Sequence, residues 1–383
     1  MKPTKVLLIH NIMWSHYKAT VFSELAKLQD SNNFELFVVQ VAATEKQRSN
    51  IGAMDKSIHK YPYGLLFEEP LDEVSWYKLA YVFIKTIFAE KFDVIVIPGY
   101  AYSFCWLAVF IARVKRKRLV MSFDSTENDN PRILWKEYIK KIFIKKFSSY
   151  LCYGTKSKEY LMKLGADPQK IYIRCQATDN QSILNVYLNS RKNRATKLAE
   201  LKLPAMNFIY VGRLSKEKNV SRLLTAFKTF KQNNISAREW GLIIVGDGPE
   251  RLSLSSWALE NKVQSVCFVG GKSWLEVPEY YSLSDVFILP SLSEPWGLVV
   301  NEAMVCGLPV IVSNKCGSAP DLVHEHKNGF TFDPLDVHEL EERLSYFADN
   351  KSDISRMSQH SLDIVTGYSP EAAARQMLMG ILL

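Results

Sequence analysis

Short apolar runs alternate with amphipathic stretches along most of the chain. The runs are rich in β-branched and aromatic residues, whereas the stretches between them repeat their apolar residues at helical spacing. Strands that are apolar throughout and are separated by helices are typical of parallel sheets covered on both faces. We expect strands at 5–10, 35–41, 93–98, 118–122 and 150–153, and then at 207–211, 241–245, 266–269, 285–289 and 309–312.

The alternation is interrupted by a polar stretch, 175–206, which has no strong strand pattern and which we interpret as the connection between two domains. A chain of 383 residues also exceeds the size, about 250–300 residues, at which a single core stops growing. We therefore expect an α/β protein with two Rossmann-like domains, residues 1–185 and 186–368. They should face one another across a cleft at the carboxyl ends of their strands.

Composition excludes several classes of protein. Apolar residues make up 47% and charged residues 23% of the chain, which is ordinary for a globular protein. The six cysteines form no C-x-x-C pair and read as reduced, buried thiols of a cytosolic protein. No apolar run approaches the ~18 residues of a membrane span, and the N-terminus does not resemble a signal peptide. The net charge of +8 favours an anionic partner, either a nucleotide, a phospholipid surface or a nucleic acid.

The motif "NFIYVGRLSKEKN" joins an apolar strand to a helix that should begin near residue 219. Gly212 allows a tight turn directly after the strand. Arg213 and Lys218 then place two cations beside a helix start, an arrangement that suits a diphosphate. The alternative is that both are ordinary solvated loop charges.

A second strand-to-glycine motif, "IIVGDGPER", resembles a dinucleotide fingerprint only in part. Arg251 stands where the third glycine of G-x-G-x-x-G would be. We therefore interpret this motif as a structural turn.

The stretch "SLSEPWGLVVNEAM" places Glu294 in a loop after a strand and Glu302 one turn into the following helix. The backbone amides of Gly297, Leu298 and Val299 would point at a ligand from the helix N-terminus. Carboxylates accept hydrogen bonds from vicinal hydroxyls, so one glutamate could hold a sugar and the other a ribose. The alternative is a helix-capping acid followed by a surface acid.

These motifs resemble those of the GT-B retaining glycosyltransferases of family 4. The resemblance covers most of 207–383, whereas the first half matches less closely. The matching segments are "VGRLSKEKN", "VGDGPE", "FVGGKSWLEVPEYYSLSDVFILPS", "EPWGLVVNE", "AMVCGLPVIVSNKCGSAPDLV" and "NGFTFDPLDVHEL". The closing segment, 369–383, looks like the last helix of that family, which crosses back onto the first domain.

The resemblance implies a role for each matched residue. Arg213 and Lys218 would bind the diphosphate of a nucleotide-sugar donor, Glu294 the sugar hydroxyls and Glu302 the ribose. The leaving phosphate itself would help to deprotonate the acceptor hydroxyl, and the absence of a D-x-D motif fits a reaction without a metal or other cofactor. The residues assigned to catalysis are Arg213, Lys218 and Glu294, and those assigned to donor binding are Gly212, Gly271, Lys272, Gly297, Leu298, Val299 and Glu302.

The first half departs from the family pattern. The usual Gly-Gly pair after the first strand is replaced by "HNIMWSHYKATVFSELA", and "MSFDSTEND" places Asp124 where many members have a histidine. The acceptor-side candidates are accordingly His16, Tyr17 and Asp124.

The segment "RILWKEYIKKIFIKKF", 132–147, has two stripes at helical spacing. One is apolar, and the other mixes cations with apolar side chains, as in a helix that lies on an anionic membrane. The alternative is a packed helix with a solvated basic edge. The purely apolar stripe comprises Leu134, Trp135, Tyr138, Ile139 and Ile142, and the mixed stripe comprises Ile133, Lys136, Lys140, Ile144 and Phe147.

We therefore expect a retaining, metal-independent glycosyltransferase that uses a UDP- or GDP-sugar and a glycan or lipid-linked acceptor. It would serve bacterial-type surface polysaccharide, lipopolysaccharide or glycolipid assembly, in the cytoplasm or on the inner face of the plasma membrane. The alternative is a non-catalytic nucleotide-sugar-binding protein of the same fold. An oxidoreductase is disfavoured by the incomplete glycine fingerprint, and a nucleic-acid binder by the lack of a recognisable motif.

Overall fold

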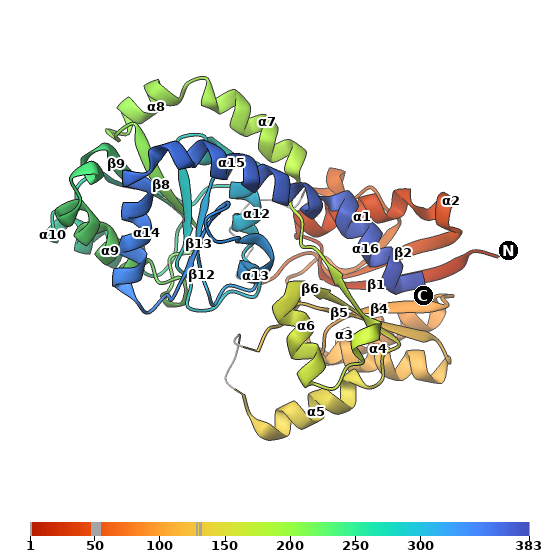
Figure 1. Ribbon diagram of the computed structural model, residues 1–383. Coiled ribbons are helices and arrows are strands. Elements are labelled where there is room, and N and C mark those ends of the chain that lie inside the picture. Colours follow the sequence, from red (N-terminus) through yellow and green to blue (C-terminus); the bar gives the residue numbers. More distant parts are fainter. Residues whose placement is uncertain (1, 47–54, 128, 130–131, 383) are drawn as a thin grey trace. The chain divides into compact units, whose positions relative to one another are not determined.

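The computed structural model describes residues 2–46, 55–127, 129 and 132–382. The chain forms two compact units, the first comprising residues 1–177 and 369–383 and the second comprising residues 178–368. Each unit is built on an open parallel sheet flanked by helices (Figure 1). The expected α/β class is therefore confirmed.

The sheet of the first unit has the strand order β3-β2-β1-β4-β5-β6-β7. After β1 the chain adds strands on one side, and with β4 it returns to the other side of β1. The central strands are apolar almost throughout because both faces of the sheet are covered. The strands are β1 (Thr4–Ile12), β2 (Phe34–Ala42), β3 (Tyr63–Phe67), β4 (Val94–Pro98), β5 (Arg118–Phe123), β6 (Ser149–Tyr153) and β7 (Ile171–Arg174).

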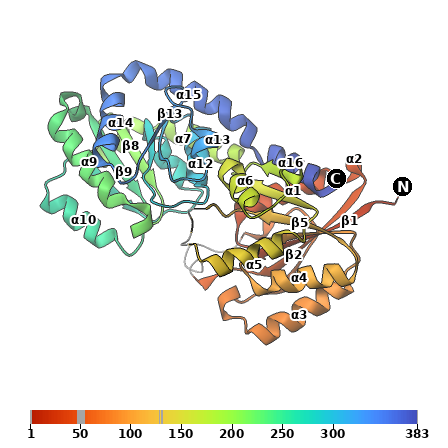
Figure 2. The ribbon, with the colours of Figure 1, turned by 60° about the horizontal axis from the view of Figure 1, so that its bottom comes forward.

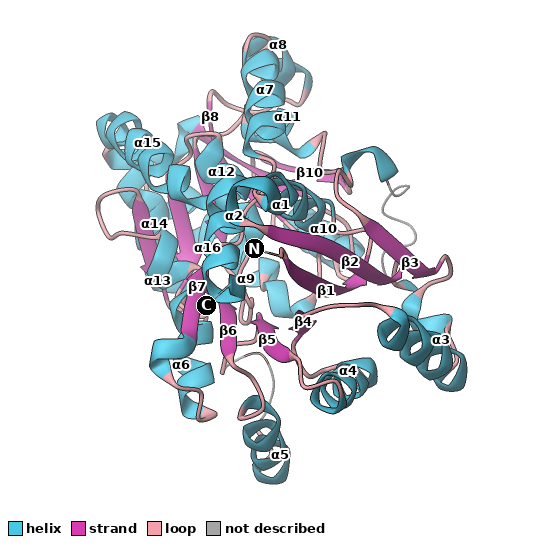
Figure 3. Ribbon diagram, turned by 90° about the vertical axis from the view of Figure 1, so that its right-hand side faces the viewer, coloured by secondary structure: helices cyan, strands magenta, loops and turns pink. Residues whose placement is uncertain are grey.

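Helices cover the two faces of this sheet in two groups (Figure 3). Phe83, Phe104 and Phe143 come from three successive helices and share one buried core with Leu7 and Ile9 of β1. These helices are α3 (Trp76–Ala89), α4 (Ser103–Val114) and α5 (Leu134–Ile144), and α6 (Gly154–Lys163) adds Tyr160 and Leu161 to the same core. The other face is covered by α1 (His16–Lys27) and α16 (Pro370–Leu382), and the short α2 (Gln29–Asn32) follows α1.

The C-terminal helix α16 packs on α1, β6 and β7, so the chain returns to the first unit as expected. The Ser149 hydroxyl donates to the Gly380 carbonyl at 2.6 Å, and the Cys175 N–H donates to Gln376 Oε1 at 2.6 Å. A Cβ added at Gly380 would lie 2.5 Å from Leu151 Cδ2. Glycine therefore lets the helix approach the sheet closely.

The sheet of the second unit has the order β10-β9-β8-β11-β12-β13. Its strands are β8 (Met206–Val211), β9 (Trp240–Val245), β10 (Val266–Gly270), β11 (Val286–Leu289), β12 (Val310–Ser313) and β13 (Gly329–Phe332). Its helices are α7 (Asn180–Arg191), α8 (Arg194–Glu200), α9 (Val220–Asn233), α10 (Arg251–Glu260), α11 (Val277–Tyr281), α12 (Leu298–Val305), α13 (Ala319–Leu322), α14 (Val337–Asp349) and α15 (Lys351–Val365).

Three strands were missed by the sequence-based prediction, and all three lie at sheet edges: β3, β7 and β13. β3 and β7 are partly exposed, and β13 has only four residues of which two are Gly329 and Thr331, so the apolar patterns of these strands are weak. The segment 175–206 contains the boundary between the two units, as expected, and most of it folds into α7 and α8. The second unit also begins at residue 178, earlier than the boundary drawn at 186, because α7 packs against α11 and α12.

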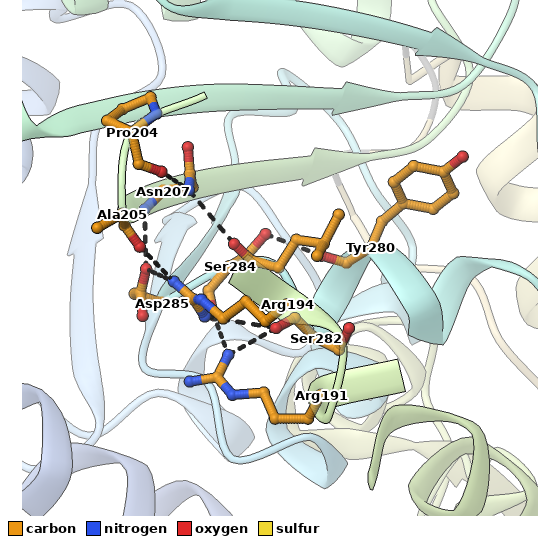
Figure 4. Close-up of polar contacts among 10 residues, drawn as sticks. Arg191, Arg194, Pro204, Ala205, Asn207, Tyr280, Ser282, Ser284 and Asp285 are labelled. Carbon is orange, nitrogen blue, oxygen red and sulfur yellow. Dashed lines mark hydrogen bonds and ion pairs between the residues drawn. The ribbon is translucent and has the colours of Figure 1, made fainter. Parts of the chain in front are cut away.

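A partly buried network of hydrogen bonds and one ion pair connects α7 and α8 to the second sheet (Figure 4). The Arg194 guanidinium donates to Asp285 Oδ2 at 2.6 Å, and the same oxygen accepts the Asn207 backbone N–H at 2.8 Å. Arg191 donates to the Ser282 carbonyl at 2.6 Å. The network thereby ties two helices to the starts of β8 and β11, opposite the carboxyl ends of these strands.

Two further sequence expectations concern cysteines and membrane spans. Five of the six cysteines are buried and Cys267 is half-buried. Within the described ranges, no helix has both the length and the apolar composition of a membrane span.

We predict that Asp285→Ala lowers the free energy of unfolding of the second unit by about 1–3 kcal/mol, because it removes the acceptor of the buried Asn207 N–H and the carboxylate paired with the half-buried Arg194. The urea dependence of amide hydrogen exchange in β8 and β11 measures the free energy of unfolding of the second unit alone. Glu200→Ala is the control, because the Lys197–Glu200 pair is exposed and should contribute less than about 1 kcal/mol. Equal effects of the two substitutions would contradict the prediction.

Candidate functional site

The candidate site lies where the winding of the second sheet reverses. β8 has β9 on one side and β11 on the other, so right-handed crossovers carry α9 and α12 to opposite faces. The loops that follow β8 and β11 diverge there and leave a crevice at the carboxyl ends of these strands. Arg213 and Lys218 follow β8, and Glu294 follows β11.

The loop after β8 is held by its own backbone and by its neighbours. The Tyr210 hydroxyl donates to the Arg213 carbonyl at 2.9 Å. Asn219, which is buried with φ of 60°, donates through its side-chain amide to the Pro290 carbonyl at 3.1 Å. These contacts leave Arg213 exposed at the turn and Lys218 partly buried beside the loop from β11.

Lys218 and Glu294 form an ion pair through Nζ and Oε2. Their side chains are only 20% and 15% exposed, so the pair is largely shielded from water. The alternative of an ordinary solvated loop charge is therefore wrong for Lys218. A shielded pair holds both side chains in one geometry before any ligand arrives.

The Pro-Trp-Gly turn connects Glu294 to α12 with little freedom. Gly297 has φ of +89°, and a Cβ added there would lie 2.9 Å from Leu289 Cδ2. Trp296 is buried, and its indole N–H donates to Asn301 Oδ1 at 2.9 Å. The helix begins at Leu298, as predicted, and the N–H groups of its first turn have no acceptor within the helix.

The loop after β12 supports Glu294 from behind. The Gly317 N–H donates to the Glu294 carbonyl at 2.8 Å, and Cys316 Sγ lies 2.8 Å from the Trp296 carbonyl. A Cβ at Gly317 would lie 1.7 Å from the Pro295 carbonyl oxygen. The "NKCGS" segment thus fixes the backbone of Glu294, a role that the sequence did not reveal.

Glu302 occupies a different environment from Glu294. The Tyr281 hydroxyl donates to Glu302 Oε2 at 3.1 Å. Burial raises the pKa of Glu302 to about 7, and the bond from Tyr281 only partly opposes this shift. Glu302 is therefore partly protonated near neutral pH.

Two further strand ends complete this edge of the sheet. Gly271 and Lys272 follow β10, and Lys272 Nζ lies 3.9 Å from Glu276 Oε1. A Cβ at Gly246 would lie 1.8 Å from the Gly212 carbonyl oxygen, so the "VGDGPE" turn packs directly on the loop after β8. This contact supports a structural reading of that motif.

The acceptor-side candidates lie in the first unit, where β1 and β4 mark the corresponding reversal. A cavity of about 280 Å³ opens there at the carboxyl ends of β1, β4 and β5. Tyr17 and Asp124 line it. His16, at the start of α1, is not among its lining residues in the described part of the chain.

The sequence did not reveal several residues that lie near the carboxyl ends of the strands in the two sheets. Lys18 also lines the cavity in the first unit, and its position directly after Tyr17 in "HYK" was the available signal. Arg174 ends β7, a strand that was not predicted. Tyr281 and Asn301 hold Glu302 and Trp296 from positions that only the fold brings close.

We predict that the protein loses stability through Glu302 as the pH rises. Below about pH 4.5 the group is protonated in both states, and between about 4.5 and 7 only the unfolded chain releases the proton. The loss should be on the order of 3 kcal/mol and complete above the folded pKa. Comparing wild type with Glu302→Gln across pH 4 to 8 measures it.

Glu342→Gln is the control, because Glu342 is exposed in the same unit. This control should keep the wild-type pH profile of unfolding. A Glu302→Gln profile that runs parallel to wild type would contradict the assignment.

The second unit is similar in sequence to a known protein family. Residues 197–362 match the family model described as glycosyl transferases group 1. The chain is 35% identical over 139 residues to sulfoquinovosyl transferase SQD2 of Arabidopsis thaliana, a match that covers 36% of this chain and 25% of that protein. It is 28% identical over 252 residues to the UDP-Gal:alpha-D-GlcNAc-diphosphoundecaprenol alpha-1,3-galactosyltransferase of Escherichia coli, with 65% and 63% of the two chains covered. The chain thus spans less than two thirds of these relatives.

Similarity of fold extends over nearly the whole chain. The crystal structure of Anabaena Alr3699/HepE in complex with UDP and glucose aligns with a TM-score of 0.73 and 18% identity, and 98% of each chain is covered. Among the described residues, no group of three or more His, Cys, Asp or Glu side chains is arranged to hold a metal ion. The chain has the GT-B fold, and its second unit carries the region that the glycosyl transferases group 1 model describes.

Proposed function

We propose that this protein is a glycosyltransferase that moves a sugar from a UDP- or GDP-sugar to a hydroxyl of a glycan or lipid-linked acceptor. The observation that carries the proposal is the shielded Lys218–Glu294 pair at the winding reversal of the second sheet, next to the N-terminus of α12. The region that matches the glycosyl transferases group 1 model includes both residues. The Escherichia coli relative, whose name specifies a UDP-galactose donor and a diphosphoundecaprenol acceptor, supports this substrate class.

Each residue of the site has a role in donor binding that follows from its chemistry. Arg213, Lys218 and the amides at the start of α12 would bind the diphosphate. Glu294 would accept hydrogen bonds from the sugar hydroxyls, and Glu302 from the ribose. The loop that contains Gly271 and Lys272 would contact the base.

The reaction would proceed with retention, as in the glycosyltransferases of family 4. The bond from the anomeric carbon to the diphosphate breaks, and a bond to the acceptor oxygen forms on the same face of the sugar. The acceptor proton passes to the leaving diphosphate. Negative charge develops on that group, and Lys218 and Arg213 would stabilise it without a metal ion.

We predict that Lys218→Met lowers transfer about 10²–10³-fold, the range for removal of one donor to a developing anion. Glu294→Gln should also lower transfer severely, because it disrupts both the pair and the contact to the sugar. A thermal-shift panel of UDP, GDP and ADP first identifies the nucleotide, because a ligand of the folded state raises the melting temperature. Transfer from the matching nucleotide-sugar is then measured in EDTA.

Glu260→Gln on α10 is the matched control, because Glu260 is exposed and distant in sequence from the site. Full activity of Glu294→Gln would refute the site assignment. Turnover that requires an added divalent metal would refute the metal-free reaction. Nucleotide binding without donor turnover, with or without acceptor, would identify a non-catalytic binding protein.

A peripheral position on an anionic membrane is part of the proposal, and it is supported by one surface of the first unit. Figure 2 shows α3, α4 and α5 side by side, and the Trp106 and Phe143 rings of α4 and α5 lie 4.3 Å apart. Large apolar side chains are exposed on all three helices: Trp76, Tyr77, Tyr81, Phe88, Trp106, Phe110, Leu134, Trp135 and Tyr138.

The stripe of α5 that we expected to face a membrane was identified wrongly. Ile144 and Phe147 of the mixed stripe are buried, and Lys140 is half-buried and binds Glu137 at 2.7 Å. The purely apolar stripe is the exposed one, with Leu134 90% and Trp135 62% exposed. The helix therefore presents its apolar side outward.

Charge makes an anionic bilayer the fitting partner for this surface. The sequences of the three helices include six lysines and arginines but a single acidic residue, Glu137, which is already paired with Lys140. Aromatic side chains that are apolar at one end and polar at the other favour the membrane interface. Basic residues near the surface add about 1 kcal/mol each.

We predict that the protein co-sediments with anionic liposomes at low salt and dissociates at high salt. Phe110→Ser combined with Trp135→Ser should weaken binding at least about tenfold, because each buried aromatic contributes 1.5 kcal/mol or more. Leu252→Ser combined with Leu259→Ser on α10, where both leucines are about 80% exposed, is the control. Failure of the wild type to bind anionic liposomes at low salt would refute the proposed position on a membrane.

A further inference from the structure

The cavity of the first unit contains charged side chains that the proposed chemistry at the second sheet does not use. It lies at the carboxyl ends of β1 and β4, where the first sheet reverses its winding. Its lining includes His10, Lys18, Asp124 and Arg174. All four residues belong to the first unit.

Arg174 is the least satisfied of these groups. It is 2% exposed, and one Nη donates to the sulfur of Met377 on α16. Among the described residues, no carboxylate lies within ion-pair distance of Arg174, and its Nε–H has no acceptor. A buried cation without a carboxylate is costly, so this position is explained best by a ligand that supplies the missing negative charge.

Lys18 brings a second basic group to the same cavity, where burial lowers the pKa of its ammonium to about 7 and Asp124 only partly opposes this shift. Its ammonium lies 4.1 Å from the centroid of the Tyr153 ring, and the Arg174 guanidinium carbon lies 4.4 Å from the same centroid. The ring stabilises both cations but does not neutralise them. Desolvation and these two charges lower the pKa of His10 to about 3, so His10 remains neutral beside them.

The acidic residues of the cavity offset only part of this charge. Asp124 interacts with Lys18 and keeps contact with solvent, although the surrounding protein raises its pKa. Glu45 accepts a hydrogen bond from the Tyr102 hydroxyl at 3.0 Å. Neither carboxylate is within ion-pair distance of Arg174 in the described structure.

We propose that Lys18 and Arg174 bind a phosphate group of the acceptor in this cavity, beside Asp124 and Tyr17. The inference rests on the proposed glycosyltransferase function and specifies the acceptor as a phosphorylated molecule. A phosphate dianion matches two basic side chains that line one cavity, and the guanidinium offers N–H groups in the planar arrangement that phosphate oxygens accept. A volume of about 280 Å³ is enough for a phosphorylated sugar.

Two kinds of acceptor present such a group, a soluble sugar phosphate and a lipid-linked phosphate. Glucose 6-phosphate and glucose probe the first, and farnesyl phosphate and farnesol probe the second. Each is titrated calorimetrically into the full-length protein saturated with the nucleotide that the thermal-shift panel identifies, which occupies the donor site and excludes phosphate binding there. At least one phosphorylated probe should bind, and its uncharged partner should bind at least about tenfold more weakly.

Lys18→Met and Arg174→Gln should each weaken binding of that phosphorylated probe about 10- to 100-fold, as expected for loss of one charged hydrogen bond. Lys27→Met is the matched control on the same helix, because Lys27 is exposed and pairs with Glu24. The thermal shift with the identified nucleotide should be the same in all variants, which separates a failed inference from a failed fold or donor site.

Several results would overturn the inference. One is equal binding of phosphorylated and uncharged probes. Another is unchanged phosphate affinity in the Lys18→Met variant, which does not depend on Arg174→Gln folding. A third is binding of the nucleotide with no response to either phosphorylated probe. Absence of binding of both UDP and GDP to the wild type would instead refute the proposed function.

Discussion

The carboxyl ends of two neighbouring parallel strands, at the point where the winding reverses, are the constraint on which the rest of this protein depends. At β8 and β11 the departing loops diverge to opposite faces, and the space between them receives Lys218 from one loop and Glu294 from the other. The supporting contacts, from Asn219 to Pro290 and from Gly317 to Glu294, hold these loops in place. The first sheet repeats the same reversal at β1 and β4, and a cavity forms there as well.

The two units differ in whether an arginine of low exposure has a carboxylate partner. In the second unit, Arg194 is matched by Asp285, and the pair ties helices to the end of the sheet away from the candidate site. In the first unit, Arg174 is buried among aromatic and sulfur groups with no carboxylate partner in the described structure. A paired charge stabilises a fold, whereas an unpaired one lowers stability unless a ligand compensates for it. This contrast is the physical reason to assign a binding role to Arg174 and a structural role to Arg194.

The two glutamates of "EPWGLVVNE" illustrate how environment separates identical side chains. Glu294 is held by a lysine, whereas Glu302 faces only a tyrosine hydroxyl in a desolvated position and has a raised pKa. A shared acid–base role would require both to face one reacting atom. Their separate partners fit better with two distinct hydrogen-bonding positions along one extended ligand.

The sequence by itself determined the fold class, the central strands and the start of α12, because buried parallel strands are apolar and helix starts follow turns such as Pro-Trp-Gly. It also placed Lys218 and Glu294 in loops that follow two strands, and the structure pairs these residues. It could not identify β3, β7 and β13, since β3 and β7 are partly exposed and β13 is four residues long and half Gly and Thr. Only the tertiary structure decided which stripe of α5 faces outward and which cations lack a partner. Both depend on contacts between residues far apart in the chain, such as Arg174 with Met377, and no local pattern encodes them.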